Sequence, residues 1–133
     1  MRPGMAHRTT HLDSLTFAER PYREQDAARH AASLTEALGL EHSRATVWRY
    51  PAGARGRRHR EGAQEEVFVV LEGRITLALG EPPEMVEVAA GGFASVSTGT
   101  EIQVRNESDA DAVVLIWGAP AVTGQGELLD DLP

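Results

Sequence analysis

One histidine and two glutamates lie close together in the stretch 53–73, GARGRRHREGAQEEVFVVLEG. His59 and Glu61 are two residues apart, so on a strand their side chains point to the same face. If Glu66 begins the following strand, its carboxylate can face the same interior. An imidazole beside two carboxylates suits either a divalent metal or general acid–base catalysis. The stretch therefore predicts a catalytic or metal site at these three residues.

The elements that must position this site are short strands. Apolar or alternating runs recur along the chain, and turns rich in Gly, Pro and Asn separate them. The runs are 43–50, 66–71, 74–79, 85–88, 93–96, 102–104 and 112–117. Many short strands with regular turns predict an all-β sandwich or barrel. The last run is continuously apolar, which is typical of a strand buried on both faces.

Two stretches resemble the two motifs of the cupin superfamily. The first motif runs Gly, five residues, His, one residue, His, three or four residues, Glu, six residues, Gly. The second runs Gly, five residues, Pro, one residue, Gly, two residues, His, three residues, Asn. The positions that match are Gly53, His59, Glu66, Gly73, Gly91, Gly99 and Asn106. The resemblance covers residues 46–118 and implies a double-stranded β-helix, which is a jelly-roll barrel.

Three positions depart from the motifs, and two of them concern the metal. Glu61 stands at the second His position, Ile102 at the third His position and Ser97 at the Pro position. Cupins with the full pattern hold a divalent metal with three His and one Glu. Here His59, Glu61 and Glu66 would remain as ligands, which suits a weakly bound Zn²⁺, Mn²⁺ or Fe²⁺. Redox-active iron usually has two histidines beside a carboxylate, so an oxygenase is disfavoured.

The same three residues also suit a site without a metal. Glu61 and Glu66 then repel each other, so either one of them takes up a proton more easily or both contact His59 or an arginine. Such a pair can act with His59 as general acid and base, as in an isomerase, lyase or cyclase. The preferred interpretation is a small-molecule pocket that is metal-free or only weakly metallated and that acts by this acid–base chemistry. The alternatives are a metal-dependent enzyme at the His/Glu/Glu site and a non-catalytic ligand-binding or dimeric module, so whether the chain is an enzyme stays open.

Five further residues are candidates for contact with a small-molecule ligand. They are Trp48, Arg57, Phe68, Ile102 and Trp117. Trp48 lies on the aromatic face of the run 43–50, where it either lines a pocket or belongs to the core. Arg57 has the parity of His59 and so points toward the pocket mouth. The neighbouring Arg55, Arg58 and Arg60 are expected on a solvated face or at a subunit contact.

The N-terminal part is expected to carry an arm and a helix. Residues 12–23 predict a short strand or arm, which the cupin resemblance implies can extend the sheet of a partner in a homodimer. Residues 24–38 show a helical period, ending at Gly39. Ser33 with Glu36 instead favours a capping box and a shorter helix, 34–38.

We expect three parts along the chain. Residues 1–45 form an arm and short helix that pack on the barrel, and residues 46–118 form the barrel. Residues 119–133 form a tail that its leucines pin to the barrel or to a partner.

The composition of the chain limits which kinds of function and location remain possible. The chain has 133 residues, which suits one domain. Its net charge of −7 argues against nucleic-acid binding. It lacks cysteine and lysine, which excludes thiol and Schiff-base chemistry by this chain. No signal-peptide core and no run of about 18 apolar residues is present, so we expect a cytoplasmic protein without a membrane span.

Overall fold

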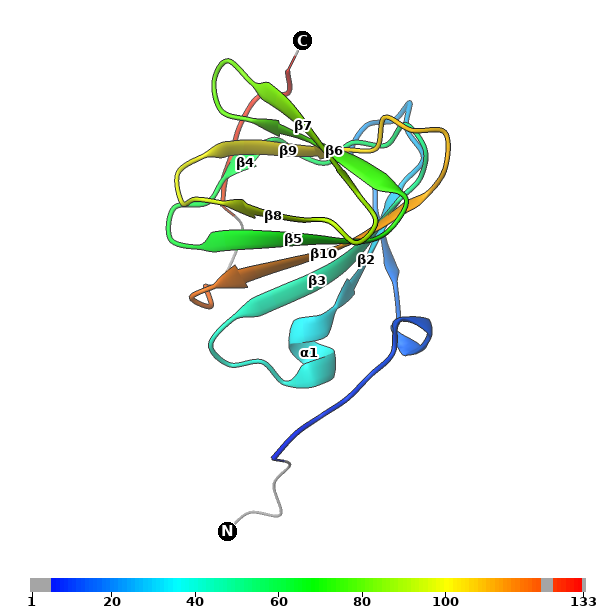
Figure 1. Cartoon of the computed structure of the whole chain (residues 1–133), viewed down its shortest axis with the longest axis vertical. Helices are drawn as coiled ribbons and strands as arrows, with labels where there is room; N and C mark the ends of the chain where they lie inside the picture. Colours follow the sequence, from blue (N-terminus) through cyan, green and yellow to red (C-terminus); the bar gives the residue numbers. More distant parts are fainter. Residues whose placement is uncertain (1–5, 123–125, 133) are drawn as a thin grey trace.

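The computed structural model describes residues 6–122 and 126–132, and in them two antiparallel sheets form a barrel (Figure 1). The strands are β1 (Ala18–Arg20), β2 (Arg29–Ser33), β3 (Arg44–Tyr50), β4 (His59–Arg60), β5 (Glu65–Glu72), β6 (Arg74–Leu79), β7 (Glu84–Ala89), β8 (Phe93–Val96), β9 (Glu101–Arg105), β10 (Ala112–Ala119) and β11 (Glu127–Leu128). The helical elements are a 3₁₀ turn at Leu12–Ser14 and α1 (Leu34–Leu38). The predicted double-stranded β-helix is confirmed.

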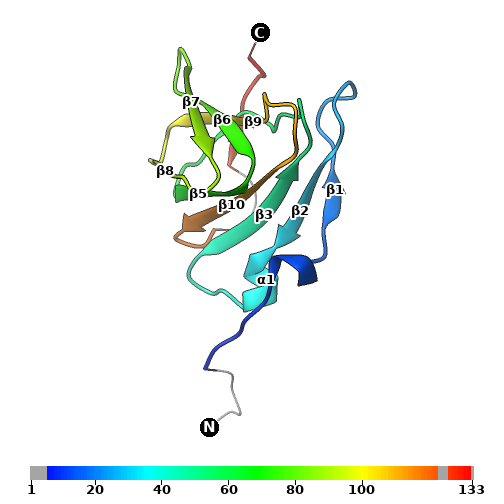
Figure 2. The ribbon, with the colours of Figure 1, turned by 45° about the vertical axis from the view of Figure 1, so that its right-hand side comes forward.

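The strand order places distant parts of the chain side by side. One sheet has the order β1-β2-β3-β10-β5-β8, and the other has the order β11-β4-β9-β6-β7. Figure 2 shows β3, β2 and β1 running outward from β10 to the edge of the first sheet. The N-terminal segment therefore widens one wall of the barrel, and the C-terminal segment adds an edge strand to the other.

The core lies between the two sheets and follows the period of the strands. Alternate residues of β5, Phe68 and Val70, point inward together with Leu77 of β6 and Val114 of β10. Each such side chain contributes about 1.5–3 kcal/mol by leaving water. Glu66 has the same parity as Phe68, so the strand that builds the core also turns this carboxylate inward.

The longer helix predicted over 24–38 is wrong, and the shorter alternative is confirmed. Residues 29–33 form β2, which pairs with β3 and buries Ala32. Sheet pairing thus prevails over the helical period of the alanines in this segment. Ser33 caps α1 by accepting a hydrogen bond from the Glu36 N–H at 3.1 Å, and Gly39 ends it with φ of 64°.

The first strand pairs within the chain. β1 lies against β2 in the same protomer, with Ala18 opposite Ala31. The arm predicted over 12–23 is therefore part of the chain's own sheet. Pairing with a partner subunit and the homodimer stay predictions. The first five residues of the expected N-terminal tail lie outside the described residues.

β10 is buried on both faces only along its first half. Val113 and Val114 are fully buried, but Trp117 is 49% exposed on the outer face of its sheet. In the described part of the chain no second layer covers that face, so the prediction for 112–117 holds only near the start of the strand.

The C-terminal segment is fixed to the barrel by backbone and side-chain contacts. β11 pairs with β4, and Asp131 accepts hydrogen bonds from Gln103 at 2.7 Å and Arg55 at 3.1 Å. Residues 123–125 and 133 of the predicted tail lie outside the described residues. No helix in the described ranges is long and apolar enough to cross a membrane.

Candidate functional site

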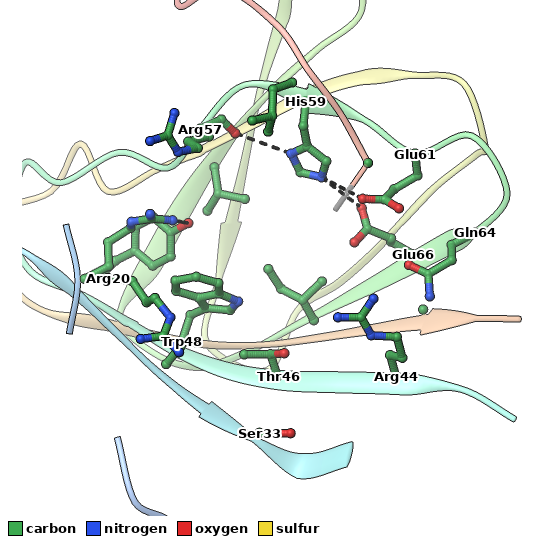
Figure 3. A pocket seen from close by; sticks show the side chains of 18 of the residues that line it. Arg20, Ser33, Arg44, Thr46, Trp48, Arg57, His59, Glu61, Gln64 and Glu66 are labelled. Atoms are coloured by element: carbon green, nitrogen blue, oxygen red, sulfur yellow. Dashed lines mark hydrogen bonds and ion pairs between the residues drawn. The ribbon is translucent and has the colours of Figure 1, made fainter. Parts of the chain in front are cut away.

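A cavity of about 570 Å³ is the setting of the candidate site. Its lining comes from both sheets: β1, β2, β3, β5 and β10 of one sheet, and β4, β9 and β11 of the other, with the segments that flank β4. Figure 3 shows Thr46 and Trp48 of β3 across the cavity from His59 and Glu66. The volume suits a small organic molecule, since ligand pockets of about 300–1,000 Å³ are typical.

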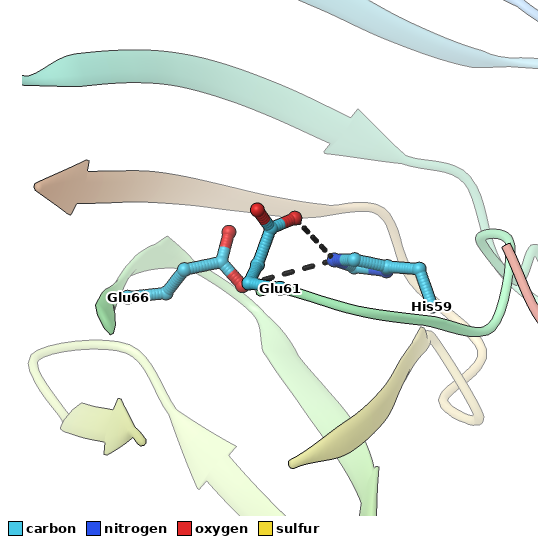
Figure 4. A group of neighbouring side chains, drawn as sticks. All are labelled: His59, Glu61 and Glu66. Carbon is cyan, nitrogen blue, oxygen red and sulfur yellow. Dashed lines mark ion pairs between the residues drawn. The ribbon is translucent and has the colours of Figure 1, made fainter. Parts of the chain in front are cut away.

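The predicted triad converges in this cavity. His59 Nε2 lies 3.2 Å from Glu61 Oε2 and 3.7 Å from Glu66 Oε1 (Figure 4). The three side chains are between 12% and 23% exposed, so they are largely withdrawn from water. The spacing argument therefore placed one imidazole and two carboxylates together correctly.

Local structure fixes each member of the triad. His59 begins β4, and Glu66 is the second residue of β5. Glu61 lies in the connection between them, where its carbonyl accepts a hydrogen bond from Gly99 N–H at 2.8 Å. Its carboxylate packs against Gly126, at which a Cβ atom would lie 2.8 Å from Glu61 Oε2. The same Cβ atom would lie 2.6 Å from the Arg60 carbonyl oxygen, so glycine at position 126 lets the C-terminal segment pack closely against Arg60 and Glu61.

The second ring nitrogen of His59 determines how the imidazole can act. Nδ1 lies 3.3 Å from the carbonyl oxygen of Arg57. A carbonyl oxygen only accepts hydrogen bonds, so we assign the Nδ1 proton to this contact. Nε2 then faces the two carboxylates, either as a second N–H donor or as an acceptor from a protonated carboxyl group.

The pKa values of the cluster are shifted in a consistent direction. Burial lowers the pKa of His59, but hydrogen bonding and charge from Glu66, the Arg57 carbonyl and the charge of Glu61 together raise it above 6.5. Burial, and then the negative charge of Glu66, raise the pKa of Glu61 above 4.5, against the opposing charges of His59 and Arg44. The expectation that one carboxyl group holds a proton more easily is met at Glu61.

The donor set also fits a divalent ion. Ligand atoms of His59, Glu61 and Glu66 all lie within 4.8 Å of one another. A metal-binding histidine usually donates its other N–H to a carbonyl or carboxylate, which is the arrangement of His59 with Arg57. Ile102 lies opposite His59 on β9 but offers no ligand atom. Three protein donors would therefore leave positions for water or substrate.

Of the five residues predicted to contact a ligand, two line the cavity and three do not. Trp48 and Arg57 line the cavity, and Trp48 also packs against the core, so both interpretations of that residue apply. Phe68 and Ile102 are 0% and 1% exposed and belong to the core, not the cavity wall. Trp117 is also outside the wall. Its neighbours on β10, Ile116 and Gly118, line the cavity. The sequence therefore predicted the wrong alternation for this strand, by one residue.

Sequence reasoning missed three of the four arginines that line the cavity. They are Arg20 of β1, Arg29 of β2 and Arg44 of β3. Arg44 shares the parity of Trp48, which was an available signal. Arg20 and Arg29 had none, because residues 12–23 were expected to form an arm and residues 24–38 were assigned to a helix. The arginines near His59 other than Arg57 form ion pairs within the chain, namely Arg55–Asp131, Arg58–Glu81, Arg60–Glu101 and Arg60–Glu127.

Residues 46–118 match the Cupin domain family, which is more than half of the chain. The chain belongs to the cupin family. A search of curated proteins found no match to it. Whether the barrel is a unit separate from 1–45 and 119–133 stays a prediction.

Solved structures of other proteins resemble most of this chain. A sugar phosphate isomerase from a cupin superfamily of Silicibacter pomeroyi has 25% identity and a TM-score of 0.72, covering 85% of this chain and 76% of that one. A putative sugar phosphate isomerase from Acidithiobacillus ferrooxidans has 25% identity and a TM-score of 0.63, covering 71% and 61%. A predicted oxalate decarboxylase from Thermotoga maritima, with 16% identity and a TM-score of 0.73, covers 85% and 99% and supports the fold alone.

Proposed function

We propose that this cupin is a non-oxidative isomerase that moves a proton between adjacent carbons of a small hydroxy-carbonyl substrate. The observation that carries the proposal is the convergence of His59 with two carboxylates inside a cavity of small-molecule size. Proton transfer needs a base that is ionised and an acid that keeps its proton near neutral pH. Because their pKa values are raised, His59 and Glu61 are suited to act as the acid. We assign the role of base to Glu66.

The reaction balances within the substrate. Glu66 takes the proton from the carbon beside the carbonyl, and the His59–Glu61 pair donates a proton to the carbonyl oxygen, which gives an enediol. The pair then accepts the proton of the neighbouring hydroxyl, and Glu66 returns its proton to the other carbon. One C–H and one O–H bond are broken and one of each is formed, so no oxidant or reductant is consumed.

A metal-dependent isomerase is the second candidate, favoured by the contact of His59 Nδ1 with the Arg57 carbonyl. A bound divalent ion supplies positive charge for an oxyanion. His59, Glu61 and Glu66 would hold it. In that case the same residues orient the ion instead of exchanging protons freely.

The comparisons support an isomerase over an oxidative enzyme. Of two solved structures at 25% identity, one carries the description sugar phosphate isomerase and the other the description putative sugar phosphate isomerase. Both share the cupin barrel with this chain. The substrate, the metal content and the ligand-binding roles of Trp48 and Arg57 remain part of the proposal.

The test follows exchange of substrate protons with solvent deuterium. Aldose and ketose sugars, free and phosphorylated, are incubated with the protein in D₂O, and carbon-bound deuterium is followed by NMR. Glu66→Gln should slow exchange at least about 100-fold. Glu65→Gln, on the opposite face of β5, is the matched control and should retain wild-type exchange.

Chelator treatment separates the two mechanisms. Exchange that persists after removal of metal supports the acid–base mechanism. Exchange that disappears and returns with Zn²⁺, Mn²⁺ or Fe²⁺ supports the metal-dependent one. No exchange with any substrate, with or without metal, would refute the isomerase and leave the non-catalytic ligand-binding module.

A further inference from the structure

The cavity is electropositive in a protein that is acidic as a whole. Four arginines and two glutamates line it, together with His59, which leaves a formal surplus of two positive charges. The chain as a whole carries a net charge of −7. The arginines are Arg20, Arg29, Arg44 and Arg57. This concentration of cations is suited to an anionic ligand.

Arg29 is the arginine of the cavity whose surroundings most favour contact with an anion. It is only 8% exposed, and among the described residues no carboxylate pairs with it. Its guanidinium lies 4.7 Å from the centre of the Trp48 ring and donates to the Tyr50 hydroxyl at 3.4 Å. Its Nε has no hydrogen-bond partner. Burying an unpaired charge is costly, and contact with an aromatic ring offsets only part of that cost.

A second arginine without a carboxylate partner among the described residues lies directly across the sheet from it. Arg20 of β1 is the cross-strand partner of Arg29, and the contact it makes within the described ranges is a hydrogen bond to the carbonyl of Glu19, at 2.9 Å. Like charges at opposed positions of an antiparallel pair destabilise the sheet. An anion that contacts both guanidinium groups removes this repulsion.

Arg57 completes this side of the cavity. It lies 5.0 Å from the ring centre of Tyr22 and, within the described ranges, has no ion pair with a carboxylate. Figure 3 shows Arg20 and Arg57 toward one end of the cavity and Glu61 and Glu66 toward the other.

Arginines outside the cavity behave differently. Seven of them form ion pairs with carboxylates: Arg23, Arg49, Arg55, Arg58, Arg60, Arg74 and Arg105. In the described part of the chain, Arg20, Arg29 and Arg57 line the cavity without an ion pair to a carboxylate. These three therefore point to a charge that comes from a ligand.

We propose that Arg20, Arg29 and Arg57 bind the phosphate group of a small phosphate monoester. A phosphate monoester carries about 1.5 to 2 negative charges at pH 7, which matches the surplus of the cavity, whereas a carboxylate supplies only one. Its three oxygens can accept from several guanidinium groups at once. The placement of the carbon end of the ligand at His59, Glu61 and Glu66 rests on the proposed function. The phosphate site itself does not.

Calorimetric titration at low ionic strength tests the site. Inorganic phosphate and glycerol 3-phosphate should bind saturably, and acetate should bind far more weakly. Arg20→Gln and Arg29→Met should each weaken phosphate binding about 10- to 100-fold, because each removes a charge-assisted hydrogen bond. Arg29→Met keeps an apolar side chain beside Trp48. If that variant does not fold, Arg20→Gln and Arg57→Gln, both at exposed positions, still decide the question.

Arg74→Gln is the matched control. Arg74 is exposed on β6 and pairs weakly with Glu87 at 3.9 Å, so its loss changes the net charge by the same amount away from the cavity. Phosphate binding should be unchanged in this variant. Equal weakening by Arg74→Gln and Arg20→Gln, tighter binding of acetate than of phosphate, or no saturable phosphate binding would overturn the proposal.

The Glu66→Gln variant separates this site from the reaction. Phosphate binding retained in that variant, with proton exchange lost, supports both proposals. Phosphate binding in the wild type without proton exchange on any phosphorylated sugar supports the site and refutes the isomerase. Exchange on free sugars without phosphate binding refutes the site alone.

Discussion

His59 Nε2 lies 3.2 Å from Glu61 Oε2, while Nδ1 of the same ring faces the Arg57 carbonyl. Both ring nitrogens therefore face oxygen atoms, which favour the protonated form of the imidazole. The imidazole and its carboxylate partner hold a proton more tightly in the folded chain than either group does in water. This contact ties the stability of the barrel to pH.

The first prediction is that His59 stabilises the fold at mildly acidic pH and not at alkaline pH. The pKa of His59 is raised in the folded state, so its contribution is fully present below the unfolded value of about 6.5 and disappears as pH rises through the folded pKa. Glu61 acts in the same direction at lower pH, because its pKa is also raised. Urea unfolding of wild type and His59→Gln between pH 5 and about pH 9 measures the difference.

The stability advantage of the wild type over His59→Gln should shrink as pH rises. The exposed His42 offers the matched control, and His42→Gln should follow the wild-type profile. Parallel curves for wild type and His59→Gln would contradict the assigned proton.

The fold and the triad could be read from the sequence because both depend on local spacing. The motif positions fixed the barrel, and the alternation of His59 and Glu61 with Glu66 at the start of a strand fixed their convergence. The cavity wall opposite the triad depends on which strands pair in the N-terminal part of the chain, and the local pattern does not show this pairing. Arg20 and Arg29 enter the cavity only because β1 and β2 join the sheet beside β3.

The direction of single side chains was the other weak point. Trp117 and its neighbours form a continuous apolar run, so the sequence carries no alternation to say which residue points inward. The pairing of Trp117 with Val67 sets that register, and it turns Ile116 and Gly118 to the cavity instead. Hydrophobicity marked the strand but left its inner face undetermined.

A second prediction concerns the position where the barrel lacks a third histidine. Ile102 is the cross-strand partner of His59 and lies on the same inner face. Ile102→His should add a nitrogen donor beside the triad and raise Zn²⁺ or Mn²⁺ affinity at least about tenfold. The metal-free variant should lose about 2–4 kcal/mol of unfolding free energy, since a buried apolar side chain becomes polar. Competition with a chromophoric chelator measures the affinity.

Ile102→Ala is the control for this substitution, because it opens the same space without adding a donor. Metal affinity that is equal in the two variants would show that an imidazole at position 102 cannot reach the ion. Adding Glu61→His to Ile102→His should increase affinity further if the cavity keeps the geometry of a complete cupin site.

A third prediction assigns a structural role to the asparagine of the second motif. Asn106 is fully buried, donates to the carbonyl oxygens of Tyr50 and Ala110 at 2.8 Å each, and accepts from Ser108. Asn106→Ala should lower the unfolding free energy by about 2–5 kcal/mol, because the buried hydrogen bond to the Tyr50 carbonyl is lost together with the contacts to Ala110 and Ser108. Urea unfolding measures the loss, and a change below about 1 kcal/mol would refute the role. Ser95→Ala, at an exposed position of β8, is the control.

The fourth prediction concerns Gly56, which leaves space for the side chains of Tyr50 and Arg29. A Cβ atom on Gly56 would lie 2.6 Å from the Tyr50 hydroxyl and 3.1 Å from Arg29 Nη1. The backbone there cannot withdraw easily, because Gly56 N–H donates to the Val104 carbonyl at 2.8 Å and its own carbonyl accepts from Gln103 at 3.0 Å. Gly56→Ala should therefore displace the Tyr50 and Arg29 side chains. We expect a loss of about 1–3 kcal/mol in stability from overpacking, and phosphate binding weakened about tenfold.

Gly62→Ala is the matched control for this change. Gly62 has open space where a Cβ atom would lie and does not have a positive φ, so the substitution meets neither a clash nor backbone strain. It should leave stability and phosphate binding unchanged. If Gly56→Ala lowered stability while phosphate bound as tightly as to the wild type, the position of Arg29 against Tyr50 would not matter for the anion. The phosphate would then have to be held by the exposed Arg20 and Arg57 alone.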